Sequence, residues 1–202
     1  EKRGYPVDLA LSDRAHIIMP YHKLMDAVEE RLRGGQRAGT TGKGIGPCYA
    51  DKVGRWGIRV ADLIDEASLK EKLMLIVPIK EKILNSLGEN VKLSPNDIFS
   101  TYSSYGKKMK KYVTDTAVLL NKVLDEEKNV LFESAQGIHL GIDSGTYPFV
   151  TSSNAGAVCS GAGVPPTSIK KIIAVVKAYT TRVGSGPFVT ELGTEKQAAM
   201  ED

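Results

Sequence analysis

The sequence has few cysteines and no long apolar run, and both shortages exclude classes of protein. Its two cysteines, Cys48 and Cys159, form no CxxC spacing and are too few for a disulfide framework among 202 residues. A reduced, cytoplasmic protein is therefore the expectation. The apolar runs are too short for a membrane-spanning helix, and the opening residues EKRGYPVD do not resemble a secretory signal.

Histidine is also scarce, and this weakens the case for a metal site. His16, His22 and His139 do not pair at the spacing of metal ligands, so structural roles are favoured for all of them. No G-x-S-x-G nucleophile motif occurs. The basic run KKMKK at 107–111 has no interleaved aromatic residues. A solvated helix face is favoured there over nucleic-acid binding, and an RNA-binding domain would depend on this run alone.

The bulk composition is that of a globular protein. Hydrophobic residues make up 42% of the chain and charged residues 25%, which is ordinary for such a protein. A length of 202 residues is enough for one large domain or two small ones, with a real core. The net charge of +3 is mild and compatible with a phosphate-bearing ligand. The chain lacks an initiating methionine and stops at AAMED without a clear closing element. We therefore expect a fragment of a larger protein.

Apolar periodicity and breaker residues predict helices and strands in alternation. Helices are expected over residues 21–33 and 67–87, from Ser94-Pro95 onward and from Thr114 onward, with a kink or split at Pro78. Strands or strand ends are expected at 7–10, 16–19 and 129–132, and a buried strand at 169–179.

Two of the expected strands run directly into Gly-rich loops. Residues 133–154 follow the strand at 129–132, and residues 183–188 follow the one at 169–179. In open α/β sheets, ligands bind at the carboxyl ends of the strands. The sequence therefore predicts an α/β fold with its loops gathered at one edge of a sheet.

A third Gly-rich stretch, GTTGKGIGPCY at 39–49, resembles two nucleotide-binding motifs but matches neither. Gly42-Lys43 is followed by Gly44, where a Walker A loop needs Ser or Thr. The glycine spacing is also wrong for a dinucleotide fingerprint. What remains is a backbone nest with hydroxyls at Thr40 and Thr41 and a cation at Lys43, which suits a phosphate monoester. A tight structural turn is the alternative.

Gln136 is a candidate ligand residue in the second Gly-rich loop. Its amide carries a donor and an acceptor that can read the edge of a planar heterocycle, and Gly137 leaves space for a flat ring. A purely structural role is equally compatible with the composition. For Asp143 in the same loop, stabilising a turn is favoured over binding.

Three segments resemble the adenylosuccinate synthetase family. They are GTTGKGIGPCYADKVGRWGIRVADL at 39–63, VLFESAQGIHLGIDSGTYPFVTSSN at 130–154 and AYTTRVGSGPFVTEL at 178–192. The resemblance runs from about residue 12 to residue 192. It implies a GTP- and Mg²⁺-dependent ligase that joins IMP to L-aspartate, giving adenylosuccinate on the way from IMP to AMP. It also implies a fragment of a larger, P-loop GTPase-like synthetase fold. That fold has a mainly parallel central sheet flanked by helices, and it works as a cytoplasmic homodimer.

The resemblance also implies site residues. Thr41 and Thr151 match threonines that bind the IMP phosphate, and Gln136 matches a glutamine that contacts IMP near its reacting face. Arg55 matches an arginine that reaches the neighbouring subunit's IMP phosphate. The catalytic acid/base pair and most GTP and Mg²⁺ contacts are expected outside this segment, so no catalytic or metal-binding residue is assigned within it.

The organisation that follows is one domain segment over residues 1–202, with a helical subdomain at 65–125. No nucleic acid or membrane is expected as a partner. The alternative function is a non-catalytic purine-nucleotide-binding module built on the same loops.

Overall fold

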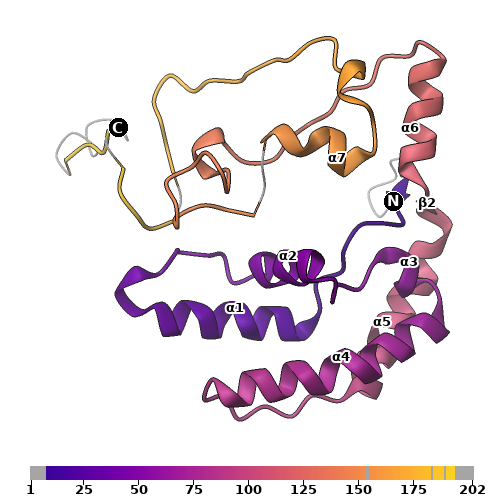
Figure 1. Cartoon of the computed structure of the whole chain (residues 1–202), viewed down its shortest axis with the longest axis vertical. Coiled ribbons are helices and arrows are strands. Elements are labelled where there is room, and N and C mark those ends of the chain that lie inside the picture. Colours follow the sequence, from indigo (N-terminus) through magenta and orange to yellow (C-terminus); the bar gives the residue numbers. More distant parts are fainter. Residues whose placement is uncertain (1–7, 153–154, 183, 189, 194–202) are drawn as a thin grey trace, which may run out of the picture.

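The computed structural model (Figure 1) describes residues 8–152, 155–182, 184–188 and 190–193. Its elements, in chain order, are β1 (Leu11–Ser12), α1 (Pro20–Arg33), η1 (Gly34–Gln36), α2 (Ile45–Gly54), α3 (Val60–Leu63), α4 (Glu66–Ser86), α5 (Pro95–Met109), η2 (Lys110–Tyr112), β2 (Val113–Thr114), α6 (Thr116–Asp125), η3 (Ile138–Leu140), η4 (Ala155–Ala157), α7 (Val158–Ala162) and η5 (Pro166–Ser168). The η elements are short 3₁₀ turns.

Local capping signals place the helix ends close to where the sequence predicts them. Proline occupies the first position of α1, and Gly34 ends that helix with φ of 54°. Ser94 caps α5 by accepting a hydrogen bond from the Asp97 amide at 3.2 Å. The last predicted helix begins at Thr116 rather than Thr114. Asp115 caps it, and Val113–Thr114 form β2 instead.

Pro78 does not split the second predicted helix, and that part of the prediction is wrong. A single helix, α4, runs from Glu66 to Ser86 with Pro78 inside it. Proline removes the amide that would bond to the carbonyl of Met74, four residues earlier. Met74 is 52% exposed, so this loss falls on the solvent-facing side of α4.

The buried core lies where α1, α3, α4 and α5 pack together, in the lower half of Figure 1. A Cβ on Gly106 of α5 would overlap the backbone carbonyl of Leu63 in α3, so only glycine permits this close packing. The buried apolar side chains of this core are Met19, Tyr21, Val28, Ile58, Leu63, Leu69, Leu73, Ile76, Val77, Leu84 and Ile98.

The sheet of the described residues is small and parallel, in keeping with an α/β protein. It consists of β1 and β2, which pair Leu11 with Val113 and Ser12 with Thr114. The predicted strand at 7–10 is wrong for residues 8–10, because pairing begins at Leu11; residue 7 lies outside the described residues. At 16–19 only His16 forms a bridge, with Arg59, and Met19 already caps α1.

The predicted strands at 129–132 and 169–179 are not strands in this structure. Both segments are irregular, and many of their apolar side chains face solvent, with Leu131, Val175 and Val176 each at least 85% exposed. A buried strand needs hydrogen-bonding neighbours as well as apolar residues. The part of the chain that the structure describes supplies no such neighbour for either segment.

Candidate functional site

The three Gly-rich loops of the sequence converge near α2. We name them the first loop (residues 38–44), the second loop (residues 133–152) and the third loop (residues 184–188). The Ser185 amide donates to the Ala38 carbonyl at 3.4 Å, and a Cβ on Gly39 would lie 2.7 Å from the same amide nitrogen. The first and third loops are therefore in direct contact.

The third loop also contacts the second. The Arg182 guanidinium donates to Thr146 Oγ1 at 3.1 Å and to the Pro187 carbonyl at 3.0 Å. A Cβ on Gly186 would overlap the Phe149 ring. The loops thus gather as the sequence predicts, but they gather around α2 and not at the edge of a sheet. Residues 153, 154 and 183 of the predicted loops lie outside the described residues.

The first loop is bonded along its backbone to Glu30 of α1. Glu30 Oε2 accepts from the amides of Gly39 at 2.9 Å and Thr40 at 3.3 Å, and Oε1 accepts from the Ala38 amide at 3.1 Å. These amides therefore bind a carboxylate of the chain itself. The predicted anion nest is already filled on this side.

Asp26, one turn earlier on α1, bonds the other half of the loop. Its Oδ1 accepts from the Thr40 hydroxyl at 2.8 Å, and its Oδ2 accepts from the Gly44 amide at 2.8 Å. Asp26 is only 5% exposed. Sequence reasoning missed Asp26 and Glu30; the available signal was two acidic residues four apart on a predicted helix just before a Gly-rich loop.

These bonds leave a short list of loop groups that face solvent with no partner. Thr41 and Lys43 are exposed, and in the described part of the chain neither side chain makes a hydrogen bond or ion pair. Directly after them α2 begins, and the first amides of a helix attract anions. Of the predicted nest, Thr40 is thus engaged internally, and Thr41 and Lys43 are available to a ligand.

The start of α2 depends on a glycine. Gly44 has φ of 79°, and a Cβ there would lie 2.9 Å from backbone atoms of His22 and Lys23. A side chain at this position would meet both a strained backbone and the packed start of α1. Gly44 therefore fixes how closely α2 approaches α1.

A buried polar cluster fixes the middle of α2 to α1 and α4. The Met19 amide donates to His22 Nδ1 at 2.9 Å, which leaves the ring proton on Nε2 to donate to Asp51 Oδ2, also at 2.9 Å. Lys80 of α4 pairs with the other oxygen of Asp51. Burial raises the pKa of Asp51, but the hydrogen bonds from His22 and Lys80 outweigh it and hold that pKa below its usual value.

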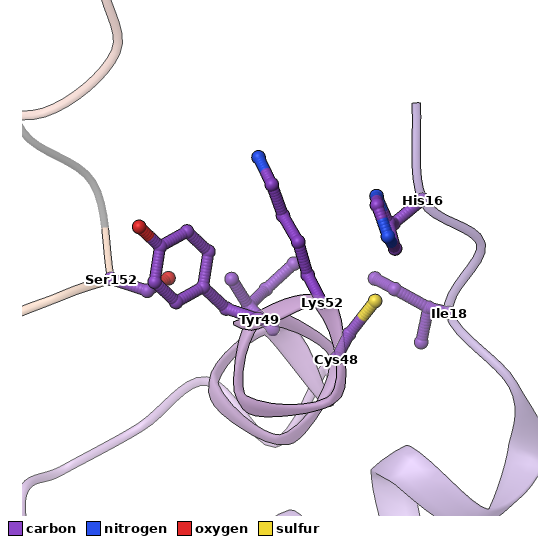
Figure 2. Close-up of a pocket in the computed structure, with 7 residues that line it drawn as sticks. His16, Ile18, Cys48, Tyr49, Lys52 and Ser152 are labelled. Carbon is purple, nitrogen blue, oxygen red and sulfur yellow. The ribbon is translucent and has the colours of Figure 1, made fainter. Parts of the chain in front are cut away.

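A cavity of about 180 Å³ lies beside α2. Figure 2 shows that Cys48 projects from α2 toward Ile18 and His16, Tyr49 projects on the opposite side toward Ser152 at the end of the second loop, and Lys52 lies between them. The lining residues are His16, Ile18, Ile45, Cys48, Tyr49, Lys52 and Ser152. The cavity therefore joins α2 to the second loop next to Thr151.

The lining of this cavity is mostly apolar, and Lys52 is the charged side chain among the residues that line it. Burial raises the pKa of the Cys48 thiol, which disfavours a nucleophilic thiolate. Burial, with Arg59 and Lys52 nearby, lowers the pKa of His16 and keeps its ring neutral at pH 7. A second cavity of about 350 Å³ shares His16 and Lys52 and adds Arg14 and Arg59 to its lining.

The four residues predicted to bind IMP occupy exposed or half-buried loop positions. Thr151 is half-buried, and its amide donates to the Leu140 carbonyl at 2.8 Å, which closes the second loop. Gln136 and Arg55 are exposed and have positive φ, of 74° and 67°. Such backbone is uncommon outside glycine and gathers at functional sites. Their ligand roles stay predictions.

The described residues contain no group of three or more His, Cys, Asp or Glu side chains able to hold a metal ion. None of the helices in the described ranges has the length and hydropathy needed to cross a bilayer.

Comparison with known proteins gives one family. Residues 1–202 match the family model described as adenylosuccinate synthetase. The chain is 53% identical over 197 residues to adenylosuccinate synthetase from Exiguobacterium sp. (strain AT1b) and 52% identical over 197 residues to that from Streptococcus sanguinis (strain SK36). Each match covers 96% of this chain and 46% of the relative.

A solved structure gives the same result. Fully ligated adenylosuccinate synthetase from Plasmodium falciparum superposes with a TM-score of 0.88 at 34% identity, over 96% of this chain and 46% of that one. The chain thus spans about half the length of the relatives it matches.

Proposed function

The chain belongs to the adenylosuccinate synthetase family, and on that premise we propose that it carries most of the IMP-binding part of a ligase. The proposed enzyme joins IMP to L-aspartate at the expense of GTP and forms adenylosuccinate. The observation that carries the proposal is the convergence of the three Gly-rich loops around α2, with Thr41 and Lys43 exposed and unpaired among the described residues.

In this proposal the IMP phosphate lies at the start of α2. The Thr41 hydroxyl and the Lys43 ammonium are free to donate, and the first turn of α2 adds amides and a favourable dipole. Thr151 would donate from the second loop, because its neighbour Ser152 lines the cavity along α2. Neutral hydroxyls with a cation and a helix end suit a phosphate monoester.

The base of IMP would be read by Gln136. In the family reaction, GTP transfers its terminal phosphoryl group to the 6-oxygen of IMP. The amine of aspartate then attacks C6, loses a proton and displaces inorganic phosphate. We assign Gln136 to hold the base edge next to this reacting face. The acid/base pair, the GTP site and the Mg²⁺ ion are proposed to belong to family sequence outside this segment.

Arg55 is proposed to serve the neighbouring subunit of a homodimer. It is exposed at the end of α2, and within the described residues its guanidinium has no hydrogen bond or ion pair. Val53 and Trp56 beside it are 66% and 45% exposed. A free guanidinium next to exposed apolar side chains is typical of a surface that another chain covers.

Two assignments extend the proposal to organisation and location. We assign residues 65–125 to a helical subdomain, supported by the packing of α4 against α5. We also assign the enzyme to the cytoplasm, in line with its two unpaired cysteines.

The test uses a polypeptide of the relatives' length that contains this sequence, which we call the full-length enzyme. Supplied with IMP, aspartate, GTP and Mg²⁺, it should form adenylosuccinate, detected by ultraviolet absorbance. The 202-residue chain alone should form none. A full-length enzyme that binds IMP yet forms no product would favour the non-catalytic nucleotide-binding module instead.

A further inference from the structure

We propose that Asp26 and Glu30 of α1 are positioning residues that shape the first loop, so that Thr41 and not Thr40 meets the ligand phosphate. The proposal rests on the proposed function for the identity of that ligand. It concerns two carboxylates that touch neither substrate nor reacting atoms.

The two carboxylates act on the loop as a pair. They lie four residues apart, so they share one face of α1. Glu30 accepts the amides that enter the loop, at Ala38, Gly39 and Thr40. Asp26 accepts the amide of Gly44, the last residue before α2. The loop is therefore bonded to the same helix at both ends.

Asp26 also determines which of two adjacent threonines has a hydroxyl available to a ligand. The Thr40 hydroxyl has one proton, and it donates that proton to Asp26 Oδ1 at 2.8 Å. Thr40 Oγ1 in turn accepts from the Gly42 amide at 3.4 Å. Thr40 is thus turned toward α1. Both threonines are exposed, but of the two only Thr41 keeps a hydroxyl with no hydrogen-bond partner among the described residues.

Two carboxylates close to a phosphate site would repel the ligand if their charge were not compensated. Here each negative charge is met by loop amides, and Asp26 is 5% exposed. The amides that the carboxylates use are unavailable to the ligand, so its phosphate is received by Thr41, Lys43 and the first turn of α2.

The experiment uses Asp26→Asn and Glu30→Gln in the full-length enzyme. Both changes keep the side-chain size and remove one acceptor and the charge. The matched control is Glu29→Gln, which removes a carboxylate from the same helix that has no hydrogen bond to the loop among the described residues. Asp26→Asn should raise KM for IMP about tenfold, with kcat and KM for GTP close to those of the unsubstituted enzyme.

Amide hydrogen exchange gives a readout that does not depend on the ligand. For this readout the variants are Asp26→Ala and Glu30→Ala, which remove both acceptor oxygens; exchange should speed up at Gly44 in the first and at Gly39 in the second, and Glu29→Ala should change neither. If Gly44 loses protection while KM for IMP stays unchanged, the positioning role is overturned and the proposed function stands. If protection at both glycines stays unchanged, the proposed hydrogen bonds are overturned.

Activity of the unsubstituted enzyme separates the two proposals. If it forms no adenylosuccinate and binds no IMP, the proposed function falls, and the choice of Thr41 for IMP falls with it. If it is active and Asp26→Asn and Glu29→Gln give the same KM for IMP, only the positioning role falls.

Discussion

Replacing Asp51 by asparagine should destabilise the chain far more than breaking an exposed ion pair. Asp51 accepts from His22 and Lys80, and the side chains of Asp51, His22 and Lys80 are 8%, 2% and 15% exposed. Asparagine has one acceptor oxygen, so one of the two donors is left facing an NH₂ group. Because Lys80 keeps its charge in a poorly solvated place, we expect a loss of about 3–5 kcal/mol in the free energy of unfolding.

The assay is urea unfolding of the chain followed by circular dichroism, with Lys107→Met as the control. Lys107 pairs with Glu66 at 2.9 Å, but the two side chains are 71% and 53% exposed. Such a pair contributes at most about 1 kcal/mol. If Asp51→Asn costs no more than Lys107→Met, the buried cluster does not stabilise α2 as we argue.

The pH dependence of the same variant gives an independent check. The pKa of Asp51 is held below its usual value in the folded chain. Its contribution to stability is therefore present above the unfolded pKa of about 3.9 and is lost as pH falls through the folded pKa. Asp51→Asn should lose stability less steeply below about pH 4 than the unsubstituted chain. Equal slopes would contradict the assignment.

Three further predictions address the site. Thr41→Ala and Thr151→Ala in the full-length enzyme should each weaken IMP binding about tenfold to a hundredfold, from the loss of about 1.5–3 kcal/mol per bond to a charged group, and should leave GTP binding nearly unchanged; unchanged IMP affinity by calorimetry would remove the assignment. Arg55→Ala and Gln136→Ala should each be nearly inactive alone. When the two variants are unfolded and refolded together, half of the dimers contain one chain of each, and one of the two sites in such a dimer is intact. About one quarter of all sites should therefore be active. Activity equal to the average of the two variants would mean that Arg55 acts within its own subunit or not at all. The pKa of His16 is lowered by burial, Arg59 and Lys52, so the folded chain resists its protonation and loses stability as pH falls below about 6.5. His16→Gln should make that loss smaller, as measured by thermal unfolding between pH 7 and pH 5, and an identical slope would refute it.

Helices were predictable from the sequence because their signals are local. Pro20, Ser94 and Gly34 act within one turn of the helix ends that they mark. Pro78 misled the prediction because the cost of a proline depends on whether the freed carbonyl can reach solvent. That condition depends on which side of the helix faces solvent, which the folded structure sets and the residues next to Pro78 do not.

Strands were the least predictable part, since they depend on distant partners. Leu11–Ser12 pairs with Val113–Thr114, about a hundred residues away in sequence. The residues next to either strand carry no signal that identifies its partner strand. Conversely, the β-branched run at 169–179 has strand composition but no ladder in the described residues. Composition reports the preference of a segment, and pairing decides its structure.

The site was half predictable for a similar reason. Gly-rich composition located all three loops. The family resemblance supplied Thr41, Arg55, Gln136 and Thr151, whose ligand roles stay predictions. The carboxylates that hold the first loop were missed because Asp26 and Glu30 belong to a predicted helix, where acidic residues are usually solvent-exposed surface charges. Their role becomes visible only once the loop folds back over α1.

The exposed apolar run at 169–179 has a consequence for how the chain behaves among copies of itself. Val175 and Val176 are 94% and 85% exposed on irregular backbone, which makes no backbone hydrogen bond to the rest of the described residues. Such a segment is a template for intermolecular cross-β stacking. The lysines at 170, 171 and 177 place like charges along it, and stacked copies would bring those charges into register. Electrostatic repulsion between chains therefore opposes aggregation here, and salt, by screening those charges, weakens that protection.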